Sequence, residues 1–262
     1  MTGFLLKKFF FDLWDNLFAI LSLNLGFLFF LALAFFLPSL LPPFLSIAGI
    51  LLFFTVIFFL FAYICAAASV LKKASDYRRP GFSEFAANLK RAFIPGTVLF
   101  GVLTLVFIIL RFSVPFYLNM GGIPGISAAF ISCWICLFII SAIQFYPAVY
   151  YRLGMRPLKS LKKCAVIFFD NTGFCFFTLA INTILSVFIF PFPGFLLLYL
   201  DEALRLRLLK YDWLDARKTE QDDKWHEPDR KRIKIPWNEL LAEEKEKTGE
   251  RSLKSFIFPG KE

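Results

Sequence analysis

The sequence predicts an all-α, polytopic membrane helical bundle of about six transmembrane helices, with two cytoplasmic interfacial helices and a charged C-terminal tail. The first observation is composition: of 262 residues, 58% are hydrophobic and 37 are Phe, whereas soluble domains average about 45–50% apolar residues. The second is position, because nearly all long apolar stretches lie within residues 1–200. The third is that successive connections between these stretches alternate between basic and uncharged.

Five apolar runs are long enough to cross the hydrocarbon core of a bilayer, which takes about 20 helical residues. They cover residues 17–37, 44–71, 95–118, 126–149 and 173–190. The first run is expected to be a membrane anchor rather than a signal peptide. It is too long for a signal peptide, it has no A-x-A site after it, and Asp12 and Asp15 precede it.

A sixth span is expected from residue 195 onward, although its apolar run is short and is followed by Asp201 and Glu202. The segment could instead lie along the interface, which would leave five spans. The distribution of Lys and Arg favours six, since basic connections stay on the cytoplasmic side. Residues 72–91 carry six basic side chains and 152–163 carry five, whereas 38–43 and 119–125 carry none. Six spans place both termini in the cytoplasm.

Two short amphipathic helices are expected at the cytoplasmic interface, before the third and fifth spans. Apolar side chains recur there at helical spacing, over residues 82–93 and 158–165. Such helices lie in the interface with the apolar face down, and neighbouring basic residues can contact anionic headgroups. The candidates for this lipid contact are Lys90, Arg91, Lys162 and Lys163.

Polar residues within or beside the spans are candidate functional residues, because ionisable groups at membrane depth are energetically costly. The candidate intramembrane polar cluster is Asn24, Gln144 and Asn182. The candidates for the inner mouth of a cavity are Asp12, Asp15, Asp170, Asp201 and Glu202. The competing interpretation is structural. Amides can bond across helices, acids can cap helix starts, and Asp201 could pair with Arg205 one turn later.

The sequence gives no pattern typical of an enzyme, a metal centre or a cofactor site, and we expect none. The single histidine, His226, cannot form a histidine metal cluster. No P-loop, G-x-G-x-x-G, H-E-x-x-H or G-x-S-x-G motif occurs. Cys133 and Cys136 have C-x-x-C spacing, but they lie in an apolar run and are read as small apolar side chains. The net charge of +9 fits membrane orientation, and no nucleic-acid partner is expected.

The expected division is a transmembrane domain over 1–213 and a cytoplasmic tail over 214–262, with the change of composition near 200–213. Within the tail, residues 236–241 look like a helix start and Gly249 would end that helix. The candidate partner-docking residues are Trp237, Leu240, Leu241, Phe256, Ile257 and Phe258. They could dock back on the bundle, or they could engage a membrane or cytoplasmic protein in a groove or extended mode. A disordered tail is the third alternative.

Three local patterns point to a family. Asp12 precedes an asparagine-bearing first span, the segment 82–85 (FSEF) runs into 88–93 (NLKRAF), and 201–206 reads DEALRL. In these, residues 10–212 resemble the YesL-type family of bacterial multi-pass membrane proteins, whose activity is not established. The resemblance implies a bacterial inner-membrane location and an accessory role beside solute transport systems. It supplies no catalytic residues.

The expected function is a non-enzymatic inner-membrane accessory or scaffold protein that presents its C-terminal segment to a protein partner. The alternative is a small-solute transporter or permease subunit that uses the region of Asn24, Gln144 and Asn182. Besides protein, the expected partner in both cases is the lipid bilayer.

Overall fold

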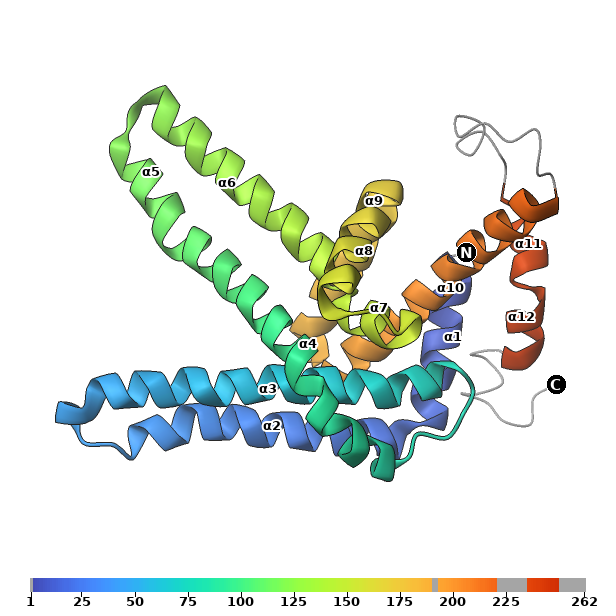
Figure 1. Ribbon diagram of the computed structural model, residues 1–262, viewed down its shortest axis with the longest axis horizontal. Coiled ribbons are helices and arrows are strands. Elements are labelled where there is room, and N and C mark those ends of the chain that lie inside the picture. Colours follow the sequence, from blue (N-terminus) through green and yellow to red (C-terminus); the bar gives the residue numbers. More distant parts are fainter. Residues whose placement is uncertain (1, 190–192, 221–234, 250–262) are drawn as a thin grey trace. The chain divides into compact units, whose positions relative to one another are not determined.

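The computed structural model describes residues 2–189, 193–220 and 235–249, and every regular element in these ranges is a helix (Figure 1). The expected all-α class is therefore confirmed for the described residues. The elements are α1 (Thr2–Asp15), α2 (Leu17–Ser39), η1 (Pro43–Leu45), α3 (Ser46–Ser75), α4 (Phe82–Ile108), η2 (Ile109–Ser113), α5 (Val114–Met120), α6 (Gly122–Ile143), α7 (Tyr146–Leu153), α8 (Pro157–Asp170), α9 (Thr172–Ile189), α10 (Pro193–Glu220), α11 (Trp237–Leu240) and α12 (Ala242–Thr248).

The chain divides into two compact units, and the second division point falls inside α10. The apolar unit is Asn16–Asp201, and the charged unit combines Met1–Asp15 with Glu202–Glu262. This boundary lies within the interval 200–213 where the composition changes. It differs from the expected division at 213/214, since α1 and the second part of α10 belong with the tail helices.

Four helical segments of the apolar unit are long and apolar enough to cross a membrane. They are Leu17–Ser39, Ser46–Ser75, Ser83–Met120 and Gly122–Leu153. A fifth is present if α8 and α9, which are bent by 104° at their junction, form one broken span. Most ends of these four segments lie within four residues of the expected ends. The exception is the third segment, which begins at Ser83 instead of near residue 95. Among the described helices, α10 does not qualify as a sixth span, because charged residues follow its short apolar start.

The segment 82–93, expected as a separate interfacial helix, is the first part of the continuous helix α4. Pro95 lies inside this helix, whereas the sequence suggested it as the start of the span. The segment 158–165 lies in α8, a helix distinct from α9. After Ile108 the chain widens into a π-helix that contains Arg111, just before Pro115. Pro115 has no backbone N–H and therefore interrupts the regular hydrogen bonds of the helix. A short π-helical segment can accommodate an interruption of this kind.

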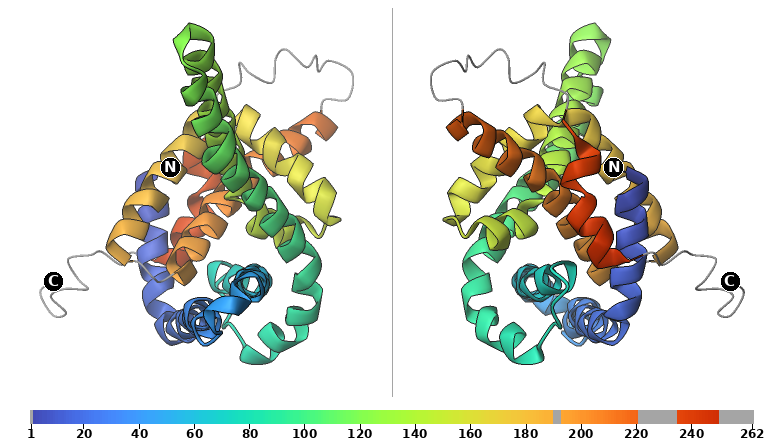
Figure 2. Two further views of the ribbon diagram at one scale, coloured as in Figure 1. Left: turned by 90° about the vertical axis from the view of Figure 1, so that its left-hand side faces the viewer. Right: turned by 90° about the vertical axis from the view of Figure 1, so that its right-hand side faces the viewer.

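Helices α2 and α3 form one antiparallel hairpin, and α4–α5 with α6 form another (Figures 1 and 2). Small residues allow the backbones of neighbouring helices, such as α3 and α4, to approach closely, as is common in membrane bundles. A Cβ atom at Gly96 would lie 2.7 Å from the Cα atom of Ala62, so α4 and α3 are nearly in backbone contact. The Tyr63 hydroxyl donates to the Leu23 carbonyl at 2.7 Å, which joins α3 to α2.

Large apolar surfaces remain exposed along the spans. Only 22% of the most apolar 18 residues are buried in three of the four spans, compared with 39% in Ser46–Ser75. The higher value fits the position of α3, which contacts α2, α4 and α7. Exposed apolar helix surface of this extent is suited to lipid, because lipid tails are as apolar as the side chains themselves.

Candidate functional site

A group of buried charges lies on the inner face of α1 in the charged unit. Residues 5, 8, 9 and 12 share one face of this helix at helical spacing, so Lys8 and Asp12 are buried together with Leu5 and Phe9. The Lys8 ammonium donates to the Asp12 carboxylate one turn later. Its Nζ atom is also 4.0 Å from Oε1 of Glu202 on α10. Lys8 and Glu202 are both 0% exposed and Asp12 is 4% exposed.

Burial and neighbouring charges act on Asp12 in opposite directions. Burial raises the pKa of Asp12 above its usual value, although the positive charge of Lys8, the hydrogen bond from Lys8 and the positive charge of Arg205 oppose this. The three groups Lys8, Asp12 and Glu202 form what we call the α1–α10 charge cluster.

The tail helices are attached to α10 and α1 within the same unit. Arg205 donates from Nε and Nη2 to Oε1 of Glu244 on α12, at 3.1 and 2.6 Å. The Arg207 guanidinium lies 5.5 Å from the centre of the Trp237 ring, which is within the range of a cation–π contact. Leu241 is 2% exposed.

Among the expected partner-docking residues, Leu241 is buried, while Trp237 and Leu240 are half-buried. The α11–α12 segment therefore packs back on the chain's own helices. Phe256, Ile257 and Phe258 lie outside the described residues.

A second buried charge group lies in the apolar unit, around Arg152 at the end of α7. Its Nε and Nη2 atoms donate to the two carboxylate oxygens of Asp201 at 2.8 and 2.5 Å. Nη1 donates to Asp76, which follows α3, at 3.1 Å. The Ser75 hydroxyl accepts from Nη2 and donates to Asp201. This Arg152 node connects the end of α3, the end of α7 and the first part of α10.

The five carboxylates expected at an inner mouth have different partners. Asp12 and Glu202 belong to the α1–α10 charge cluster, and Asp201 belongs to the Arg152 node. The suggested pairing of Asp201 with Arg205 is wrong, since Arg205 binds Glu244 instead. Asp170 is exposed and accepts a hydrogen bond from Asn171 at 3.2 Å. Asp15 is exposed as well.

The three candidate intramembrane amides bond to different helices. Oδ1 of Asn24 accepts the backbone N–H of Gly194 at 2.8 Å, which ties α2 to α10. Nε2 of Gln144 donates to the carbonyl of Cys175 at 3.0 Å, which ties the end of α6 to α9. Asn182 is half-buried. Within the described residues, Nδ2 of Asn24, Oε1 of Gln144 and Oδ1 of Asn182 are buried without a hydrogen-bond partner.

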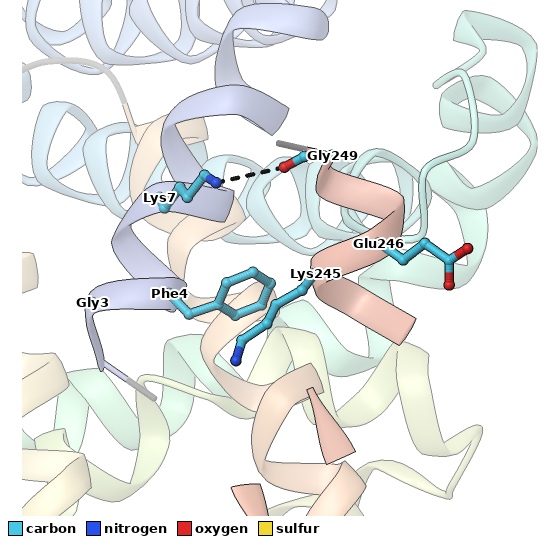
Figure 3. Close-up of a pocket in the computed structure, with 6 residues that line it drawn as sticks. All are labelled: Gly3, Phe4, Lys7, Lys245, Glu246 and Gly249. Carbon is cyan, nitrogen blue, oxygen red and sulfur yellow. Dashed lines mark hydrogen bonds between the residues drawn. The ribbon is translucent and has the colours of Figure 1, made fainter. Parts of the chain in front are cut away.

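An open groove separates α1 from α12 in the charged unit (Figure 3). Its volume is about 580 Å³, and Lys7 donates across one end to the Gly249 carbonyl at 3.5 Å. The Phe4 ring and the aliphatic stem of Lys245 face each other across it, whereas Glu246 points away (Figure 3). The groove is lined by Gly3, Phe4, Lys7, Lys245, Glu246 and Gly249.

Sequence reasoning missed Lys8, Arg152 and Glu244 as members of buried contacts. A usable signal existed only for Lys8, which stands four residues before Asp12 on the apolar face of an amphipathic helix. Arg152 was interpreted only through the positive-inside bias, which does not separate an exposed arginine from a buried one. Glu244 lies in a run of charged residues and has no local feature that distinguishes it.

The described residues contain no group of three or more His, Cys, Asp or Glu side chains placed to hold a metal ion. Their described cysteines are free thiols. Compared with models of protein families, with curated proteins and with solved structures, the chain matches none.

Proposed function

We propose that this chain is a non-enzymatic bacterial inner-membrane accessory or scaffold protein whose charged unit presents residues 250–262 to a protein partner. One observation supports this most directly. The tail helices α11 and α12 are attached to α10 and α1 through Arg205–Glu244, Arg207–Trp237 and Lys7–Gly249. The end of α12 is therefore fixed within the unit. The apolar residues Phe256–Phe258 follow Gly249 by seven to nine positions in the sequence.

The proposed topology has six spans with both termini in the cytoplasm, α10 supplying the sixth. The alternation of basic and uncharged connections supports it. The start of α4 and helix α8 lie at the inner interface, where Lys90, Arg91 and Lys162 are exposed and Lys163 is half-buried. These side chains suit anionic headgroups. Reporter fusions at residues 40, 77, 121 and 155 test this topology, and a cytoplasmic signal at 40 or 121 would contradict it.

Partner capture from membranes tests the scaffold role. Deleting residues 250–262 should abolish cross-linking to the partner, because the apolar segment is lost while α11 and α12 remain. Arg205→Met should weaken capture, because α12 loses its ion pair with α10. The position of Gly249, after which residues 250–262 follow, is then less well fixed. The matched control is Glu243→Gln, also on α12, which removes the exposed Glu243–Lys247 pair and keeps the Arg205–Glu244 ion pair. If the deletion leaves the set of cross-linked proteins unchanged, the proposal is wrong.

The alternative function, a small-solute transporter or permease subunit, is supported by the three buried amide atoms without a partner at Asn24, Gln144 and Asn182. Buried polar groups of this kind are often bonded to water. A water-filled path past them predicts that cysteines placed at these positions react with membrane-impermeant thiol reagents. Unreactive cysteines at all three positions would reject this alternative.

A further inference from the structure

The groove between α1 and α12 is an open surface within the charged unit. Its floor is apolar, formed by Gly3, Phe4 and the stem of Lys245 (Figure 3). Two ammonium groups, on Lys7 and Lys245, stand at its edges. An apolar floor between cations suits aromatic side chains, since ring faces attract ammonium groups and long basic side chains cover apolar surface with their stems.

The chain itself leaves the helical tail at this groove. Gly249 lines it and has a positive φ of +74°, a backbone conformation that favours glycine. Its N–H donates to the carbonyls of Lys245 and Glu246 at 3.0 Å each, which closes α12. Residues 250–262 therefore begin at the edge of the groove.

The length and chemistry of the following segment match the groove. Phe256 comes seven residues after Gly249, and a chain spans at most about 3.3–3.6 Å per residue, or roughly 25 Å in total. This tether is long enough to turn back over a groove of about 580 Å³. In an extended conformation, Phe256 and Phe258 would share one face, since side chains alternate. That face would meet the Phe4 ring and the two lysines.

We propose that the groove between α1 and α12 is the docking site for residues 255–259 of the same chain, which are thereby held until a partner takes them. A short tether gives an effective concentration in the millimolar range, so this intramolecular contact precedes any encounter with a second molecule. The docking deepens the proposed function and rests on it for its purpose, but it is measurable without a partner.

The labelling rate of Ser255→Cys, which keeps both Phe256 and Phe258, tests the docking on the full-length protein in detergent. The blocking variant is Gly3→Trp, because a Cβ atom at Gly3 meets nothing within 4 Å, so the new ring fills the groove without disturbing α1. Gly3→Ala is the matched control. We expect maleimide labelling of residue 255 to be about tenfold faster with Gly3→Trp than with Gly3→Ala, the factor that about 1.4 kcal/mol of docking free energy gives.

Disulfide formation gives a second, independent readout. A Gly3→Cys/Ser255→Cys pair should cross-link within one chain faster than Leu6→Cys/Ser255→Cys, since Gly3 lines the groove, whereas Leu6 is 42% exposed on α1 and does not. Equal labelling rates with Gly3→Trp and Gly3→Ala, or cross-links that form only between two chains, would overturn the docking.

The two proposals fail in different ways. If the segment is presented but never docked, deletion of 250–262 abolishes partner capture while Gly3→Trp changes neither labelling nor capture, and only the docking is overturned. If the segment docks but serves no partner, Gly3→Trp accelerates labelling while the deletion leaves capture unchanged, and the proposed function is overturned. If both hold, Gly3→Trp increases partner capture as well as labelling.

Discussion

Replacing Arg152 with methionine should destabilise the apolar unit more than any other single charge removal there. Arg152 donates to Asp201 through two nitrogens, and it also contacts Asp76 and Ser75. The side chains of Arg152 and Asp201 are only 9% and 3% exposed. Methionine keeps most of the apolar stem but removes all of these donors, so the Asp201 carboxylate stays buried with the Ser75 hydroxyl as its remaining partner in the node.

The magnitude follows from burial. Removing one partner of a buried ion pair costs about 3–5 kcal/mol, because the other charge is left uncompensated. Asp76 is 28% exposed, and exposed pairs contribute about 0–1 kcal/mol, so Asp76→Asn should cost about 1 kcal/mol or less. Arg152→Lys keeps the charge but loses the planar fork, so its cost should fall between the two.

The double variant Arg152→Met/Asp201→Leu decides whether the cost comes from the unpaired carboxylate. Removing both charges should destabilise less than Arg152→Met alone, because no buried charge remains. The assay is unfolding of the purified protein in detergent by heat or by increasing SDS, with all four variants measured together. An Arg152→Met cost equal to that of Asp76→Asn, or a double variant less stable than Arg152→Met, would refute the reasoning.

Three further changes have defined outcomes in the same unfolding assay. Gly96→Ala should cost about 1–3 kcal/mol, because the new Cβ atom would lie 2.7 Å from the Ala62 backbone; Gly101→Ala, with nothing within 4 Å, should be neutral or slightly stabilising. Asn24→Ala should cost about 1–3 kcal/mol, since the Gly194 N–H loses its acceptor, and an unchanged melting temperature would contradict this. The pKa of Asp12 is raised in the folded protein, so its stabilising contribution is present at low pH and lost as the pH rises through that pKa. The melting temperature of wild type minus that of Asp12→Asn should therefore fall as pH rises, and a constant difference would argue against it.

The spans were predictable because hydropathy and length are local properties. Helix α2 begins at Leu17 as expected and ends two residues beyond the expected end at 37. Helix α3 begins two residues after the expected start and extends four residues past the expected end, as far as Ser75. An apolar run of about 20 residues needs no knowledge of its neighbours to form a span.

Helix continuity was harder to predict, because it depends on what surrounds a proline. Pro95 removes one backbone donor and usually marks a boundary, yet α4 continues through it from Phe82 to Ile108. Proline is tolerated inside membrane helices where neighbouring groups compensate the lost bond. The amphipathic pattern over 82–93 identifies a helical face, but it does not say whether this helix and the next share an axis.

The long-range charge contacts could not be predicted from periodicity. Asp12 and Glu202 are far apart in sequence, as are Arg152 and Asp201, and no local pattern specifies which charged residues meet. The sequence does single out Asp12, Asp201 and Glu202 as polar residues near the ends of spans and as candidates for the inner mouth of a cavity. It could not assign their partners, and it paired Asp201 with its near neighbour Arg205 because helical spacing was the only geometry available.

The buried acids share one feature that bears on function. Asp12, Glu202, Asp201 and Glu244 each face a basic side chain from Lys8, Arg152 or Arg205, and all but the Lys8–Asp12 pair join different helices. A desolvated carboxylate paired in this way fixes which helices pack together, and its charge is already engaged by the protein. These ion pairs therefore account for the burial of the four acids by helix packing within each unit.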